Sequence, residues 1–248
     1  MNYQFDTDKI SQHVVKYGVD IRPPISPEQD RTTLQDYGNW LVEQFPDVFE
    51  TLLSGPRELR VQRTFILPNT KRVELPTFVL TSRGPVFTFP RRLFIDRAHE
   101  LNIPDKDNIF RKAFDQLRTR FPERTVPRVG VVHEFVFETG YISSLDVVTS
   151  TLKHDLWRQK VKNLRIVLEA PSEGKNVNIQ LRPTYLQRAA KRGNALPADD
   201  MKFGIVVNVD INNQQMVADM SAEQINDILD FASAYIPGEL IKFLNNEY

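Results

Sequence analysis

Residues 104–140 constrain the fold of this chain most, because a helix there stops at a proline and leads directly into a strand. Before the proline, apolar side chains recur at helical spacing and predict one buried stripe: Ile109, Phe110, Ala113, Phe114, Leu117 and Phe121. Pro122 ends the helix, because its ring and its missing N–H break the hydrogen-bond ladder. The residues after it place one apolar set on alternate positions, which predicts a long strand: Val129, Val131, His133, Phe135 and Phe137.

Similar patterns on both sides of this segment predict an α+β protein with a curved, mainly antiparallel sheet and helices on one face. The sequence favours a strand from Tyr17 to Ile25, after a loosely attached N-terminal arm. Further alternating runs predict strands near 59–67, 73–80, 86–95, 164–169, 177–182 and 203–211. Pro76 and Pro90 indicate edge strands or bulges, since proline cannot donate to the ladder. Ser221 and Gln224 have capping-box spacing and predict the start of a last helix.

The order of these elements suggests two tandem β-α-β-β-β-α halves, residues 1–125 and 126–248, which could also form one continuous domain. No residue-level repeat supports the duplication, so it depends on element order alone. A chain of 248 residues is long enough for either arrangement.

Composition excludes some kinds of site. The chain has no cysteine, which rules out thiol catalysis, a disulfide framework and cysteine-based zinc sites. No metal motif, phosphate-binding glycine loop, dinucleotide fingerprint or nucleophile elbow occurs, so neither a metal nor a cofactor is expected. The start of the chain does not resemble a secretory signal and no membrane-length apolar run occurs; a cytoplasmic protein without membrane contact is therefore expected.

Charge is distributed unevenly, although the net charge is zero. Residues 1–56 carry four basic and nine acidic side chains (−5), residues 57–128 sixteen and eight (+8), residues 129–192 ten and six (+4), and residues 193–248 two and nine (−7). Such asymmetry can guide association between copies. It can equally arise because the ends of the chain pack against the middle.

One face of the strands in the second half is apolar, and the opposite face carries a polar set. The candidate binding residues on it are Glu138, Arg165, Gln180, Arg182, Asn208 and Asp210. An antiparallel sheet with one solvated face produces this alternation without any function. The alternative is a surface that receives a partner or a small ligand.

His133 is the single candidate for acid–base catalysis, because its position in the alternation places an imidazole on the apolar face. A core histidine bonded to the backbone would look the same in the sequence. Glu134 points to the opposite face, which argues against a pair within the strand. Whether the chain is an enzyme stays open at this point.

A basic segment, residues 57–97, offers nucleic-acid binding as another alternative. Its arginines include Arg60, Arg63, Arg91 and Arg92, interleaved with Phe65, Phe78, Phe87, Phe89 and Phe94. Arginine with aromatic rings is typical of single-stranded nucleic-acid binding, through phosphate pairing and base stacking. The same phenylalanines could instead form the core face of their strands.

Two stretches, VPRVGVVHEFVF (residues 126–137) and FGIVVNVDIN (residues 203–212), together with chain length and element order, resemble an uncharacterised, sporadically distributed prokaryotic family. The resemblance implies a duplicated α+β fold and a cytoplasmic prokaryotic protein. It brings no functional residues with it. The leading hypothesis from the residues is therefore a non-enzymatic binding protein, partnered by itself as a homo-oligomer or by another protein.

Overall fold

The structure is a computed structural model that describes the chain in several ranges. They are residues 3–66, 72–94, 100–140, 142–151, 165–169, 171–172, 174–186, 202–245 and 247.

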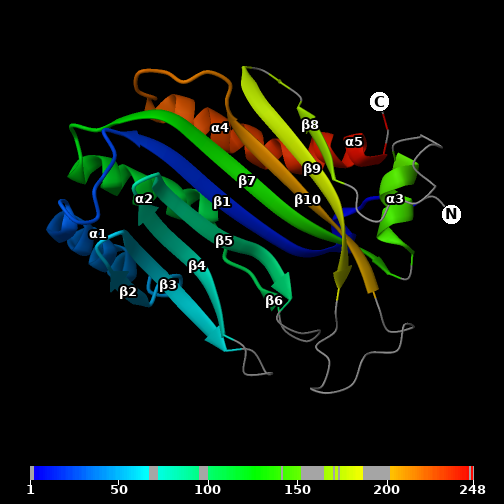
Figure 1. Cartoon of the computed structure of the whole chain (residues 1–248), viewed down its shortest axis with the longest axis horizontal. Coiled ribbons are helices and arrows are strands. Elements are labelled where there is room, and N and C mark those ends of the chain that lie inside the picture. Colours follow the sequence, from blue (N-terminus) through cyan, green and yellow to red (C-terminus); the bar gives the residue numbers. More distant parts are fainter. Residues whose placement is uncertain are drawn as a thin grey trace.

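Within the described residues, a single sheet of ten strands forms the body of the protein (Figure 1). The strands are β1 (Ile10–Arg22), β2 (Thr51–Ser54), β3 (Glu58–Ile66), β4 (Arg72–Thr81), β5 (Gly84–Phe94), β6 (Glu100–Leu101), β7 (Thr125–Gly140), β8 (Ile166–Glu169), β9 (Lys175–Leu186) and β10 (Lys202–Asn213). Their order is β2-β3-β4-β5-β1-β7-β10-β9-β8, with β6 beside β5. Every neighbouring pair is antiparallel, as the sequence predicts.

In the described residues the two halves have a similar order of elements, although the first half has two more strands than the predicted β-α-β-β-β-α order. The helices are α1 (Arg31–Gln44), α2 (Lys106–Arg120), α3 (Ser144–Thr151), α4 (Ala222–Tyr235) and α5 (Ile241–Asn245). Each half starts with a central strand, β1 or β7, continues through a helix and an antiparallel meander, and ends in a long helix, α2 or α4. Because β1 and β7 pair with each other, the two halves share one continuous sheet.

The helices cover one face of the sheet. Figure 1 shows α2 and α4 lying behind the central strands, and α1 joins this layer where the Tyr37 ring meets Phe78 and the Tyr37 hydroxyl donates to the Ala113 carbonyl. Alternate strand residues point into this layer, so Phe135 and Val207 are 1% and 0% exposed. The expected register is therefore confirmed.

The helix and strand within residues 104–140 follow the prediction. α2 runs from Lys106 to Arg120, ahead of Pro122, and its whole predicted stripe is buried. Both prolines expected at bulges also lie at register shifts. Pro90 faces Val14 where the β1–β5 pairing shifts, and Pro76 lies where β3 and β4 change register.

The N-terminal segment differs from the prediction. β1 begins at Ile10 rather than Tyr17 and lies at the centre of the sheet. The preceding residues are also fixed, because the Asn245 amide bonds both the N–H and the carbonyl of Phe5, at 2.8 and 3.0 Å. Buried polar residues, Ser11 and His13, blur the alternation that would have revealed the first part of this strand.

No helix in the described ranges is long and apolar enough to cross a membrane.

Candidate functional site

The predicted polar residues lie on the face of the sheet opposite the helices, which we call the open face. Pairing across the strands places Gln180, Asn208 and Glu134 in one row, and Asp210, Val132 and Lys16 in the next. The Lys16 ammonium and the Glu134 carboxylate are 3.6 Å apart, so Glu134 indeed turns away from His133. Ion pairs between neighbouring strands are thus part of this surface, as an ordinary solvated sheet would have them.

The other predicted residues on the open face have varied surroundings. The exposed Arg165 guanidinium donates to the Gln180 side chain at 2.7 Å. Arg182 is exposed opposite Val206, whereas Glu138 is half-buried opposite Gly204. The side-chain oxygen of Asn208 is buried without a hydrogen-bond partner, which leaves a free acceptor in the row beside Glu134.

A shallow hollow of about 410 Å³ lies on the open face over β1 and β7, beside the turn between β4 and β5. It forms because Gly18 of β1 and Gly130 of β7 are directly paired and supply no side chains. A Cβ on Gly18 would meet nothing within 4 Å. We call this feature the glycine hollow; its charged lining consists of Lys16, Asp20, Arg83, Arg128 and Asp210. Sequence reasoning missed it, because two isolated strand glycines carry no signal until the register pairs them.

A second polar group lies on the other side of the sheet, between the central strands and the helices. His13 of β1 and His133 of β7 are 7% and 2% exposed, and their rings share a 3.0 Å hydrogen bond between Nε2 of His13 and Nδ1 of His133. The ring of His13 also stacks on Phe135 at 4.1 Å. The sequence placed His133 on this face correctly but gave His13 no partner.

Both imidazoles are held in the neutral form. Burial lowers the pKa of His13 to about 2, helped by His133 and by the nearby cations Arg91 and Lys106. Burial likewise lowers the pKa of His133 to about 3, with the same two cations contributing and Asp107 opposing them. A buried neutral histidine can donate or accept a hydrogen bond, but it holds no extra proton near neutral pH.

Asp107 belongs to α2 and links this helix to β1 and α4 beside the two histidines. Its carboxylate accepts hydrogen bonds from the Tyr17 hydroxyl of β1 and, at 3.0 Å, from the Ser233 hydroxyl of α4. Burial and then Asp107 raise the pKa of Tyr17, so the phenol remains a donor. We call these residues the histidine cluster: His13, Tyr17, Arg91, Lys106, Asp107, His133 and Ser233.

The four arginines named for the nucleic-acid alternative have different partners. Arg60 pairs with Glu58 and Glu74 at 3.3 and 3.5 Å, and Arg92 pairs with Glu100 at 3.5 Å. Arg63 donates to the Asp47 carbonyl and lies over the Phe65 ring. The positive charge of Arg91 instead helps to lower the pKa of the two buried histidines.

The aromatic part of that alternative also lacks support. Phe78, Phe87 and Phe89 are fully buried in the core, so no base can stack on them. Nucleic-acid binding stays a hypothesis that would depend on phosphate contacts and on the half-buried Phe65.

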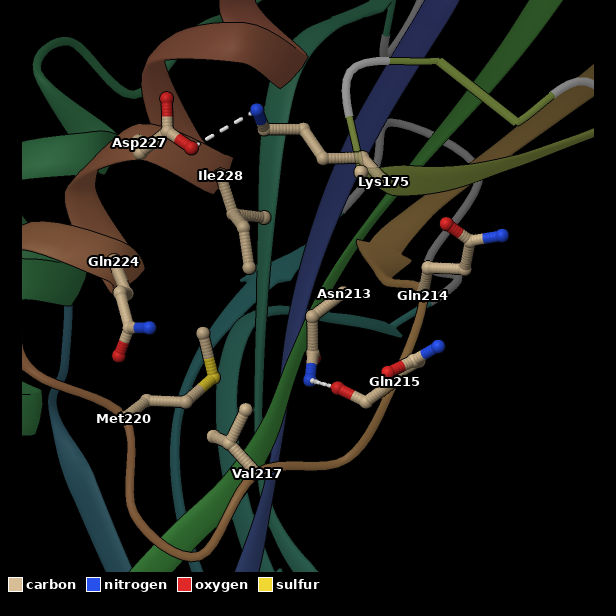
Figure 2. Close-up of a pocket in the computed structure, with 10 residues that line it drawn as sticks. Lys175, Asn213, Gln214, Gln215, Val217, Met220, Gln224, Asp227 and Ile228 are labelled. Atoms are coloured by element: carbon tan, nitrogen blue, oxygen red, sulfur yellow. Dashed lines mark hydrogen bonds and ion pairs between the residues drawn. The ribbon is translucent and has the colours of Figure 1, made fainter.

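Another hollow of about 410 Å³ lies between the end of β10 and the first turns of α4 (Figure 2). Its polar groups are largely satisfied by one another. Lys175 reaches Asp227 at 2.9 Å and lies over the Phe231 ring, and the Asn213 amide donates to the Gln215 carbonyl at 2.7 Å. These contacts favour a structural role for this lining.

Among the described side chains, no group of three or more histidines, aspartates and glutamates is arranged to hold a metal ion.

Comparisons with known proteins add little. No protein-family profile matches the chain, and no curated protein matches it. Among solved structures it is similar to the di-domain ARO/CYC BexL from the BE-7585A biosynthetic pathway, at 12% identity over 96% of this chain and 97% of that one, with a TM-score of 0.15. A likeness of that size carries no argument about function.

Proposed function

We propose that this is a non-enzymatic interaction protein that self-associates through its open face. The observation that supports the proposal is the distribution of charge around the glycine hollow. On the β1 side, two cations and one carboxylate line it: Lys16, Arg83 and Asp20. On the β7–β10 side, one cation, Arg128, accompanies the carboxylate of Asp210. Glu134 lies beside the lining and pairs with Lys16 of the same chain at 3.6 Å.

This arrangement is self-complementary in a two-fold dimer. If two open faces stack about an axis parallel to β1 and β7, the β1 side of each copy meets the β7 side of its partner. The more positive side then faces the more negative one at both ends of an isologous interface. The glycine hollow removes side chains from the centre, so the two backbones can approach closely there.

Sedimentation velocity tests the proposal by a charge swap. Lys16 and Asp210 occupy one row of the sheet, so Lys16→Glu or Asp210→Lys alone should weaken self-association about tenfold, by opposing like charges. The double variant should recover association, since the charges are again opposite. High salt should weaken the wild-type dimer by screening.

The matched control is Lys112→Glu, which reverses an exposed charge on α2, in the helix layer. It should leave association unchanged. A monomer at every protein and salt concentration would overturn the proposal, as would a double variant that associates no better than either single variant.

A further inference from the structure

Asp20 of β1 and Arg128 of β7 lie directly opposite each other in the lining of the glycine hollow. Opposite charges in such cross-strand positions ordinarily pair with each other. Here, within the described part of the chain, neither side chain makes a hydrogen bond or an ion pair, although both are half-buried. The hollow therefore holds one free carboxylate and one free guanidinium side by side.

The next row of the sheet allows another molecule to reach these two groups. Two positions along the strands, Gly18 faces Gly130, and a Cβ on Gly18 would meet nothing within 4 Å. Glycine within a strand often marks a place where another backbone approaches closely. A second copy of the chain can consequently come near both strands at this point.

A two-fold axis parallel to β1 and β7, and midway between them, makes the two charges complementary. Such an axis places β1 of one copy over β7 of the other and preserves the position along the strands. Asp20 of each copy then faces Arg128 of the other, and the two glycine pairs face each other. The interface is isologous, so the same ion pair forms twice.

Neighbouring positions of the axis lack this complementarity. An axis that runs along β1 would place Asp20 over Asp20 of the second copy, and one along β7 would place Arg128 over Arg128. Like charges opposed across an interface are unfavourable and suppress that arrangement. The charges in the hollow therefore favour a single register.

We propose that two copies associate in one register, with the axis between Gly18 and Gly130 and with Asp20 of each copy bound to Arg128 of the other. This register rests on the self-association proposed above, and it names the contact that selects the orientation of the second copy. A guanidinium can bind a carboxylate through two parallel hydrogen bonds, which adds geometric specificity. Exclusion of water from the middle of the interface strengthens such a pair.

Charge reversal tests the contact in sedimentation velocity. Asp20→Arg or Arg128→Asp alone opposes like charges twice in this dimer, so each should weaken self-association by about tenfold or more. The double variant should associate as the wild type does, because opposite charges face each other again. The matched control is Glu169→Arg, which reverses an exposed carboxylate on the edge strand β8 of the same face and should leave association unchanged.

Cross-linking measures the register without altering Asp20 or Arg128. The chain has no cysteine, so a single introduced cysteine reports on one position. Gly18→Cys lies beside the proposed axis, in a place with room for its side chain, and a short bis-maleimide should link two copies through it. Glu169→Cys lies on the same face but at the edge of the sheet, and it should not link.

The outcomes separate the register from self-association itself. A dimer that does not link through Gly18→Cys, or that links equally well through Glu169→Cys, would overturn the register and leave self-association intact. A double charge variant that associates no better than either single variant would also overturn the register. A chain that stays monomeric at every protein concentration would overturn self-association, and the register with it.

Discussion

At the scale of single residues, the most informative feature is a pair of histidines buried in neutral form between the sheet and its helices. His13 and His133 face each other from the two central strands, and the charged groups around them come from β5 and α2: Arg91, Lys106 and Asp107. A core histidine of this kind fits a fixed hydrogen-bonding role better than a proton-transfer role near neutral pH. The hypothesis of a His133-centred enzyme remains untested.

The histidine pair should make stability fall with acidity. Each ring has a lowered pKa in the folded state, about 2 for His13 and about 3 for His133, so only the unfolded chain takes up the protons as pH drops below about 6.5. The free energy of unfolding should therefore decrease by up to roughly 1.4 kcal/mol per pH unit for each ring between about pH 6 and pH 4.

Urea unfolding of the wild type and of a double His13→Gln, His133→Gln variant across this range measures the effect. The variant should lose most of the acid slope, since its side chains do not titrate. Equal slopes in the two proteins would show that other groups cause the acid sensitivity.

At the scale of elements, local sequence rules account well for α4 and poorly for β1. The capping box expected at Ser221 and Gln224 is confirmed: the Ser221 hydroxyl accepts from the Gln224 N–H at 3.2 Å, and the Gln224 side chain accepts from the Ser221 N–H at 2.9 Å. By contrast, no local sequence pattern predicts that β1 occupies the centre of the sheet. Its position results from pairing with β5 and β7, which lie far away in the chain.

Ser221→Ala should lower the free energy of unfolding by about 1 kcal/mol, because the Gln224 N–H at the start of α4 loses its acceptor. Denaturant unfolding measures the change. Ser221→Asp retains a capping oxygen and should stay within a few tenths of a kcal/mol of the wild type. A loss as large as that of the alanine variant would show that the cap is not the cause.

Hydrogen exchange should separate central from edge strands. Amides of β1 and β7 are bonded on both sides and covered by helices, so they should open only with global unfolding. Amides of β2 and β8, four-residue strands at the two edges, should exchange fastest within the sheet. Similar protection in the edge and central strands would contradict this order.

At the scale of the whole molecule, the β1–β7 pair joins the two halves into one sheet, and Asp107 ties α2 to both β1 and α4. The division into halves therefore describes the order of the elements, and the expected boundary near residue 125 coincides with the first residue of β7. Because these contacts cross the boundary, the two halves are expected to unfold cooperatively.

Unfolding should consequently occur in one transition. In a Trp157→Phe variant, the fluorescence of Trp40 reports on the first half, where this side chain packs against the core. Its midpoint in denaturant should equal that of NMR signals from β10 in the second half. Phe135→Ala, which removes a fully buried ring from the central strand, should lower both midpoints together, with a loss of about 3–5 kcal/mol. Separate midpoints would show that the halves unfold independently.

The sequence by itself determined the antiparallel α+β architecture and, for most strands, the side that faces the core. These follow from periodicity, proline and capping, which act over a few residues and so can be read locally. Only the tertiary structure decided which residues meet across the sheet. Gly18 opposite Gly130, His13 against His133, and Lys106 beside Arg91 each combine residues from different elements, and pairing between distant strands depends on the global register. Both candidate sites arise from that register, so alternation placed a few of their residues, such as His133 and Asp210, on one face of the sheet but did not show which residues meet.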